Sequence, residues 1–129
     1  MEDEAGSVVA LVERQCRARP SAIAVELPDG GTRTYAELGR RASRIAEVLE
    51  PLLSAPRATV AVDLPGGMDF CAAVIAVLAG GGTLLAIDRT QPDARLATIV
   101  ATARPRVVIT DRRERAAWTP GSAPRPVTS

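Results

Sequence analysis

Lysine and histidine are both missing from this 129-residue chain, although arginine supplies sixteen basic side chains. Without histidine, a Ser-His-Asp catalytic arrangement is excluded, because no imidazole is present to accept the proton of the serine. Without lysine, the chain can form neither a Schiff base nor a nucleophile activated by a lysine amine. The two cysteines, Cys16 and Cys71, are far apart in the chain and have no histidine partner, which excludes a zinc pattern. Both lie in apolar helical patterns, so we expect reduced, buried thiols.

Aromatic residues are almost as scarce, since Tyr35, Phe70 and Trp118 are the only ones. Basic and acidic residues nearly balance at a net charge of +1 and are mixed along the chain. Nucleic-acid binding favours concentrated positive charge and aromatic stacking, so this class is disfavoured. The longest apolar run, residues 71–79, is about half a membrane span, and the acidic start lacks a secretory pattern. We expect a cytoplasmic protein that binds neither nucleic acid nor membrane.

The length and composition are those of one globular domain, with 47% hydrophobic and 24% charged residues. We assign residues 1–111 to this domain. Residues 112–129 are expected to form a short helix, over 112–118, and a proline-rich tail.

The hydrophobic pattern predicts helices that alternate with strands. Helices are expected over about residues 7–19, 35–50, 69–79 and 90–103, a β-hairpin over 22–34, and strands over 59–64, 83–88 and 106–110. The three strands are continuous apolar runs, which is typical of strands covered on both faces. The predicted fold class is therefore α/β: a small three-layer parallel sheet with crossover helices, preceded by an N-terminal helix and a β-hairpin.

Local signals define several element ends. Thr34 and Glu37 have the spacing of a capping box at a helix start. Residues 69–79 are apolar almost all round, so this helix is expected to lie between layers at the centre of the core. The glycines at 80–82 predict a left-handed helix stop, and Thr90 is the expected N-cap of the next helix.

Two of these segments have a recognisable order of residues. The first is Thr-Tyr-Ala-Glu-Leu at 34–38, and the second is Leu-Ala-Gly-Gly-Gly-Thr-Leu-Leu-Ala-Ile-Asp at 78–88, followed by Pro92 and Arg95. Together they resemble the first two core motifs of adenylation domains of nonribosomal peptide synthetases, members of the AMP-forming acyl-ligase superfamily. The resemblance covers about residues 8–110. The second motif departs from the usual Leu-Lys-Ala-Gly at its start, and Ala86 and Arg89 replace the family's usual prolines.

The resemblance implies that the catalytic parts of the family lie outside the matched region. They are a Ser/Thr/Gly-rich loop around the ATP phosphates, an aromatic-rich motif near the adenine, an aspartate for the ribose and a lysine on a mobile C-terminal domain. The glycines at 80–82 follow a helix instead of preceding one, so a helix stop is favoured over a phosphate-binding loop. We therefore expect no catalytic residue, no cofactor and no metal site in this chain.

The best small-molecule candidates are Asp63 and Asp88, which lie at the expected carboxyl ends of parallel strands. The favoured alternative is that these carboxylates cap the following helices or face the solvent. Candidate partner-binding residues are Trp118, Arg112 and Arg113, because tryptophan and arginine are typical interface anchors. Trp118 folding back over the chain's own sheet edge is an equal alternative, and a GC-rich coding bias also accounts for the all-arginine basic set.

The resemblance implies a truncated adenylation domain that retains only the N-terminal portion. The expected role is a non-catalytic protein-interaction or scaffolding module in nonribosomal peptide biosynthesis. Its expected partner is a condensation domain, the rest of an adenylation domain, or a second copy of the chain. The alternatives are one half of a split amino-acid-adenylating enzyme completed by another polypeptide, and a remnant without function.

Overall fold

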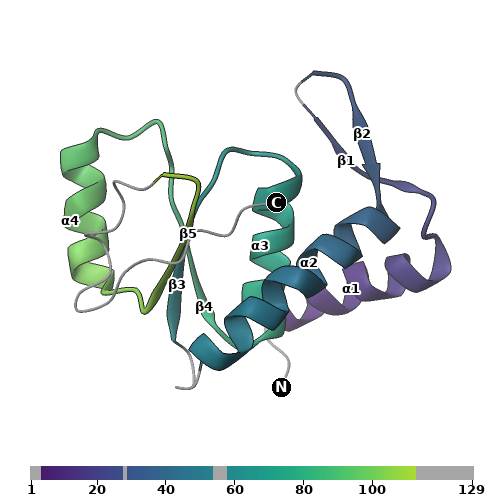
Figure 1. The fold of residues 1–129 in the computed structure, drawn as a ribbon, viewed down its shortest axis with the longest axis horizontal. Coiled ribbons are helices and arrows are strands. Elements are labelled where there is room, and N and C mark those ends of the chain that lie inside the picture. Colours follow the sequence, from purple (N-terminus) through teal and green to yellow (C-terminus); the bar gives the residue numbers. More distant parts are fainter. Residues whose placement is uncertain (1–3, 28, 54–57, 113–129) are drawn as a thin grey trace.

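The computed structural model describes residues 4–27, 29–53 and 58–112, and its helices and strands follow the predicted order (Figure 1). The elements are α1 (Glu4–Ala18), β1 (Ile23–Glu26), β2 (Thr32–Thr34), α2 (Tyr35–Leu49), the 3-10 helix η1 (Glu50–Leu52), β3 (Thr59–Asp63), α3 (Met68–Ala79), β4 (Thr83–Ala86), α4 (Asp93–Ala103) and β5 (Val107–Thr110). Within these ranges, every helix is too short or too polar to cross a lipid bilayer.

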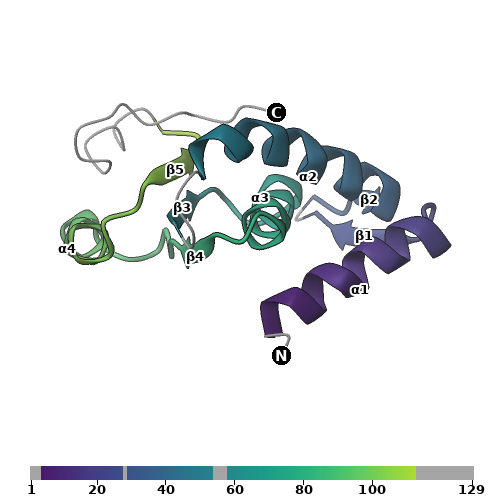
Figure 2. The same ribbon diagram turned by 90° about the horizontal axis from the view of Figure 1, so that it is seen from below.

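The parallel sheet has the strand order β4-β3-β5, and the separate hairpin of β1 and β2 is antiparallel. Val60 in the central strand is aligned with Leu84 on one side and with Val107 on the other. Helix α4 lies against one face of the sheet, whereas α3 lies against the opposite face, with α2 and α1 on that same side (Figure 2). The predicted three-layer α/β class is therefore confirmed.

Hydrophobic side chains fill both faces of the sheet, because successive residues of a strand point to opposite sides. On the face covered by α2 and α3, the buried strand residues are Val60, Val62, Val107 and Ile109, and they pack with Leu38, Ala42, Ile45, Leu49, Ala72, Ala73, Ala76 and Val77. On the face covered by α4, Ala61 and Val108 pack with Ile87, Leu96 and Val100. This two-sided burial explains why the strands are continuous apolar runs in the sequence.

Helix α3 is central to the core, but its circumference is not buried all round. Its buried residues are Ala72, Ala73, Ala76 and Val77. Val74 and Ile75 are only half-buried, so the expectation of burial on every side is wrong. The sheet and α2 cover the alanine-rich side of the helix, and the remaining side is incompletely covered.

The two cysteines are free thiols, as expected, but both are half-buried instead of buried. Cys16 in α1 donates a hydrogen bond from Sγ to the carbonyl oxygen of Tyr35, at 3.3 Å, and so connects α1 to the start of α2. Burial raises the pKa of the Cys71 thiol.

The capping box at the start of α2 is present as predicted. The hydroxyl of Thr34 accepts a hydrogen bond from the Glu37 N–H at 3.3 Å. The Glu37 carboxylate accepts one from the Thr34 N–H at 3.0 Å, which lowers the pKa of Glu37. Helix α4 differs from the prediction, because its N-cap is Pro92 and no side chain caps it. Thr90 is therefore not the N-cap.

The glycine run after α3 closes that helix. The N–H groups of Gly80, Gly81 and Gly82 donate to the carbonyl oxygens of Ala76, Leu78 and Val77, respectively. Gly81 has φ +79°, the left-handed conformation that a Schellman turn requires. A Cβ at Gly82 would lie 3.3 Å from the Ala58 carbonyl oxygen, so this position has little room for a side chain. The helix-stop interpretation agrees with these bonds, which occupy all three amides.

Candidate functional site at the carboxyl edge of the sheet

The carboxyl ends of the three parallel strands bring together polar residues that are distant in the sequence. After β3 the chain continues to α3, and after β4 it continues to α4 on the opposite face of the sheet (Figure 2). Open α/β sheets ordinarily bind ligands outside the carboxyl ends of their strands, where the strand order reverses. Asp63 ends β3, Asp88 follows β4, and Thr110 ends β5.

Asp63 is fully buried, with none of its surface exposed. Its Oδ2 atom accepts a hydrogen bond from the Thr110 hydroxyl at 2.7 Å, which joins the ends of β3 and β5. Because Asp63 neither caps α3 nor faces solvent, both favoured alternatives for this residue are wrong. The reason is that the side chain points across the sheet edge to β5 instead of forward along the chain.

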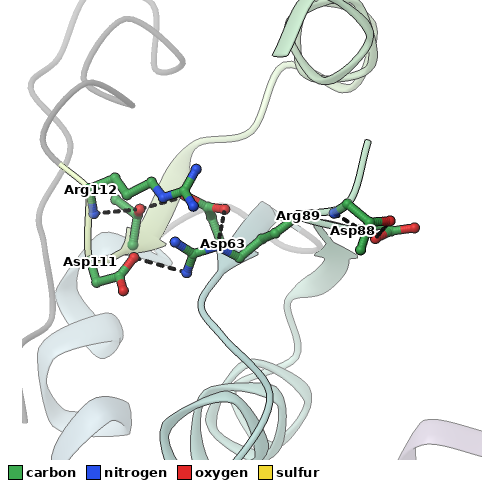
Figure 3. Close-up of polar contacts among 7 residues, drawn as sticks. Asp63, Asp88, Arg89, Asp111 and Arg112 are labelled. Atoms are coloured by element: carbon green, nitrogen blue, oxygen red, sulfur yellow. Dashed lines mark hydrogen bonds and ion pairs between the residues drawn. The ribbon is translucent and has the colours of Figure 1, made fainter. Parts of the chain in front are cut away.

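Arg89 provides the cation of this cluster. Its Nε atom lies 3.8 Å from Asp63 Oδ1, and its NH1 nitrogen lies 3.0 Å from Asp111 Oδ1. Figure 3 shows the Arg89 side chain reaching from the end of β4 toward Asp63 and Asp111. Only 18% of this side chain is exposed, so the guanidinium fills the position between the ends of the strands. We call Asp63, Arg89, Thr110 and Asp111 the edge cluster.

Asp88 lies apart from the edge cluster and is exposed, as the solvent-facing alternative expected. Its Oδ1 atom accepts hydrogen bonds from the Thr90 hydroxyl at 2.6 Å and from the Thr90 N–H at 3.0 Å. These bonds, the hydroxyl first, lower the pKa of the Asp88 carboxyl. The two aspartates that the sequence singled out are therefore not brought together into one site.

The candidate partner-binding residues lie largely beyond what the structure describes. Arg112 is half-buried and lies outside any helix or strand, and its N–H donates to the Thr110 hydroxyl oxygen at 3.0 Å. Arg113 and Trp118 are outside the described residues, as is the remainder of the expected helix and tail.

Sequence reasoning missed Arg89, Thr110 and Asp111. Each lies at, or directly after, the carboxyl end of a predicted strand, and that position alone is the signal that could have identified them. The pairing of Arg89 and Thr110 with Asp63, and of Asp111 with Arg89, depends on the strand order, which places β3 between β4 and β5. The sequence predicts parallel strands but not their order.

The edge cluster has the chemistry of a structural network that connects the ends of the three strands to one another. A buried carboxylate is tolerated when hydrogen bonds and an opposite charge compensate its lost hydration. Thr110 and Arg89 provide that compensation for Asp63, and Asp111 in turn pairs with Arg89. In the part of the chain that the structure describes, no three potential ligands are grouped so that they could hold a metal ion.

These features define an open, doubly wound α/β unit of the kind found in the N-terminal subdomain of adenylate-forming enzymes. Comparison with known proteins identifies the family. The chain belongs to the AMP-binding enzyme family, whose model matches residues 12–127.

The relatives are mainly peptide synthetases. The chain is 40% identical over 107 residues to the probable non-canonical nonribosomal peptide synthetase CymA of Salinispora arenicola, covering 82% of this chain and 1% of that protein. It is 35% identical over 109 residues to novobiocin biosynthesis protein H of Streptomyces niveus, covering 84% of this chain and 18% of that protein. It thus spans a small fraction of either relative's length.

Solved structures agree with this assignment. The nonribosomal peptide synthetase FmoA3, in a form bound to AMPPNP, matches with a TM-score of 0.76 and 33% identity over 91% of this chain and 13% of that one. The N-terminal subdomain of Klebsiella oxytoca NpsA matches with a TM-score of 0.74 at 20% identity, which shows a common fold alone. The chain therefore corresponds to a short N-terminal portion of a nonribosomal peptide synthetase adenylation domain.

Proposed function

We propose that this chain, as a free polypeptide, is a non-catalytic interaction module that docks on a nonribosomal peptide synthetase partner in the cytoplasm. The observation that carries the proposal is the position of Arg89. This side chain starts after β4, lies across the carboxyl ends of the parallel strands, where an open α/β sheet ordinarily binds its ligand, and pairs there with Asp63 at the end of β3 and with Asp111 after β5.

The backbone amides of the second motif support the same proposal. A phosphate-binding loop presents N–H groups that converge on the anion, commonly at the positive start of a helix. The amides of Gly80, Gly81 and Gly82 instead donate to carbonyl groups at the end of α3. In addition, the 129 residues contain no lysine that could stabilise the charge developing on the phosphates.

A binding experiment tests the non-catalytic half of the proposal. Isothermal titration calorimetry of the chain with ATP and Mg²⁺ is expected to show no saturable heat. A dissociation constant in the micromolar range would contradict the proposal. Arg89→Ala is the informative companion variant, because ATP binding gained only in this variant would mean that Arg89 occludes a latent site.

The partner half of the proposal is tested by mixing the chain with separately produced synthetase domains. We expect a stable complex with a condensation domain, measured by analytical ultracentrifugation. A complex with neither a condensation domain nor the remaining part of an adenylation domain would contradict docking.

A split enzyme is the second candidate, and the small share of each relative that the chain covers favours it. In that case the remainder of an adenylation domain would supply the ATP loop and the lysine. Amino-acid-dependent exchange of pyrophosphate into ATP separates the two functions. The module predicts no exchange in the mixture, whereas the split enzyme predicts exchange only when both polypeptides are present.

A further inference from the structure

The outer edge of β4 is suited to pairing with another strand. β3 is the only strand beside β4 in the described residues, so the opposite edge faces away from the sheet. Thr83 and Ala86 are exposed, and Leu84 and Leu85 are half-buried. β4 contains no charge and no proline, which are the features by which edge strands ordinarily resist pairing.

The other edge strand, β5, also contains no charge and no proline, but its side chains are more buried. All four of its side chains are buried. Charged residues flank β5 on both sides, whereas Asp88 and Arg89 flank β4 on one side and the glycines at 80–82 lie on the other. β4 is therefore the more exposed edge strand and the one with fewer flanking charges.

The backbone bonds of β4 determine which of its groups face outward. The N–H of Thr83 donates to the carbonyl oxygen of Ala58 at 2.9 Å, and the N–H of Ile87 donates to the carbonyl oxygen of Val62 at 3.0 Å. Alternate residues of a parallel strand bond to the same neighbour, so Leu84 and Ala86 direct their N–H and C=O groups away from β3. An added strand must pair with these two residues.

We propose that β4 pairs in antiparallel orientation with β4 of a second copy of this chain, in a register that places Leu84 opposite Ala86 of the second copy. Leu85 then lies opposite Leu85 of the second copy, on the two-fold axis. The two Leu84–Ala86 pairs use every outward N–H and C=O group of both strands. This self-complementarity is what a closed, symmetric dimer requires, and it makes a second copy the occupant of the edge.

Charge and packing agree with this register. Asp88 lies opposite Gly82 of the second copy, so no like charges face each other across the axis. Leu84 belongs to the cluster on the α3 face, whereas Leu85 belongs to the cluster on the α4 face. Pairing therefore extends both apolar layers across the axis and covers leucine surface that is half-exposed in one copy. The inference is independent of the proposed function.

Disulfide trapping tests the register. In a background of Cys16→Ser and Cys71→Ala, the Leu85→Cys variant is expected to form an intermolecular disulfide under mild oxidation. Directly opposite residues of a non-hydrogen-bonded antiparallel pair have Cβ atoms about 4.5–5.5 Å apart, close to disulfide geometry. Thr83→Cys is the matched control, because Thr83 lies opposite Ile87 of the second copy and should not crosslink. Equal crosslinking of the two variants would overturn the register.

Light scattering of the chain with its original sequence, including both cysteines, tests whether the chain self-associates. A dimer is expected at high micromolar concentration. Ala86→Pro removes an outward N–H without touching the bonds of β4 to β3, and should weaken self-association by at least about tenfold. Circular dichroism melting of this variant establishes that it is folded. A monomeric chain at high micromolar concentration, or a folded Ala86→Pro variant that dimerises as well as the original, would overturn the proposal.

Discussion

The hydrogen bond between Thr110 and Asp63 gives a direct test of the edge cluster. Replacing Thr110 with valine removes the hydroxyl while nearly conserving the side-chain volume, so no cavity is created. The Asp63 carboxylate, which is fully buried, then loses the donor that lies 2.7 Å from its Oδ2 atom, and the part-buried Arg112 N–H loses its acceptor. Water cannot easily replace that donor at a buried position.

The expected cost follows from the charge of the acceptor. A hydrogen bond to a charged group contributes about 1.5–3 kcal/mol to stability. Domains of ordinary size have unfolding free energies of about 5–15 kcal/mol, so Thr110→Val removes a substantial part of the total. The expected change corresponds to a decrease of roughly tenfold to a hundredfold in the ratio of folded to unfolded protein.

Urea denaturation followed by circular dichroism measures this cost, because the unfolding free energy extrapolates linearly to zero denaturant. Thr102→Val is the matched control: its hydroxyl donates to the Thr98 carbonyl oxygen on the exposed side of α4. We expect this control to change the unfolding free energy by no more than about 0.5 kcal/mol. If Thr110→Val changes the unfolding free energy no more than the control does, the hydrogen bond to Asp63 does not stabilise the folded chain and the prediction is wrong.

Two further predictions concern α3 and the capping box. Val77→Asp should abolish cooperative thermal melting, because Val77 is fully buried and its replacement leaves a charge in the core. Ile75→Asp is the control, and this variant should still melt cooperatively because Ile75 is half-buried. Equal effects of the two substitutions on thermal melting would contradict the packing of α3. The pKa of Glu37 is lowered in the folded chain, so its contribution to stability is present above the ordinary glutamate pKa and is lost as the pH falls through the lower, folded value. The difference in unfolding free energy between the original chain and Glu37→Gln should therefore decrease from about pH 4.3 downward, and a difference that is constant with pH would contradict this account.

The sequence predicts most of the fold because its strongest signals are local. The capping box at Thr34 and the stop at Gly81 depend on backbone groups within a few residues, and both are present. The apolar strands are recognisable because both of their faces are covered. Thr90 failed as a cap because its hydroxyl donates to Asp88, so the turn before α4 extends to Pro92. The spacing of residues in the sequence does not show whether a hydroxyl will cap a helix or bond to a neighbouring carboxylate.

The edge cluster was only partly predictable, because it is produced by strand order. Asp63 was a candidate because open α/β sheets bind ligands at the carboxyl ends of their strands. The partners of Asp63, however, come from the ends of two other strands. Arg89 and Asp111 are 22 positions apart in the chain, and Thr110 and Asp63 are 47 apart. Nothing local to any of these residues indicates that the others lie nearby. For the same reason, the half-exposure of Ile75 depends on how α1 and α2 cover α3, which periodicity does not specify.

The two motifs that carry the family resemblance have structural roles within the chain itself. Thr34 and Glu37 satisfy backbone groups at the start of α2, and Gly81 provides the left-handed turn between α3 and β4. None of these roles requires ATP or an amino-acid substrate. A polypeptide that contains only this portion can therefore retain the residues by which its family is recognised, because those residues hold its own helices and strands together. Membership of the family consequently predicts the fold of this chain more directly than its activity.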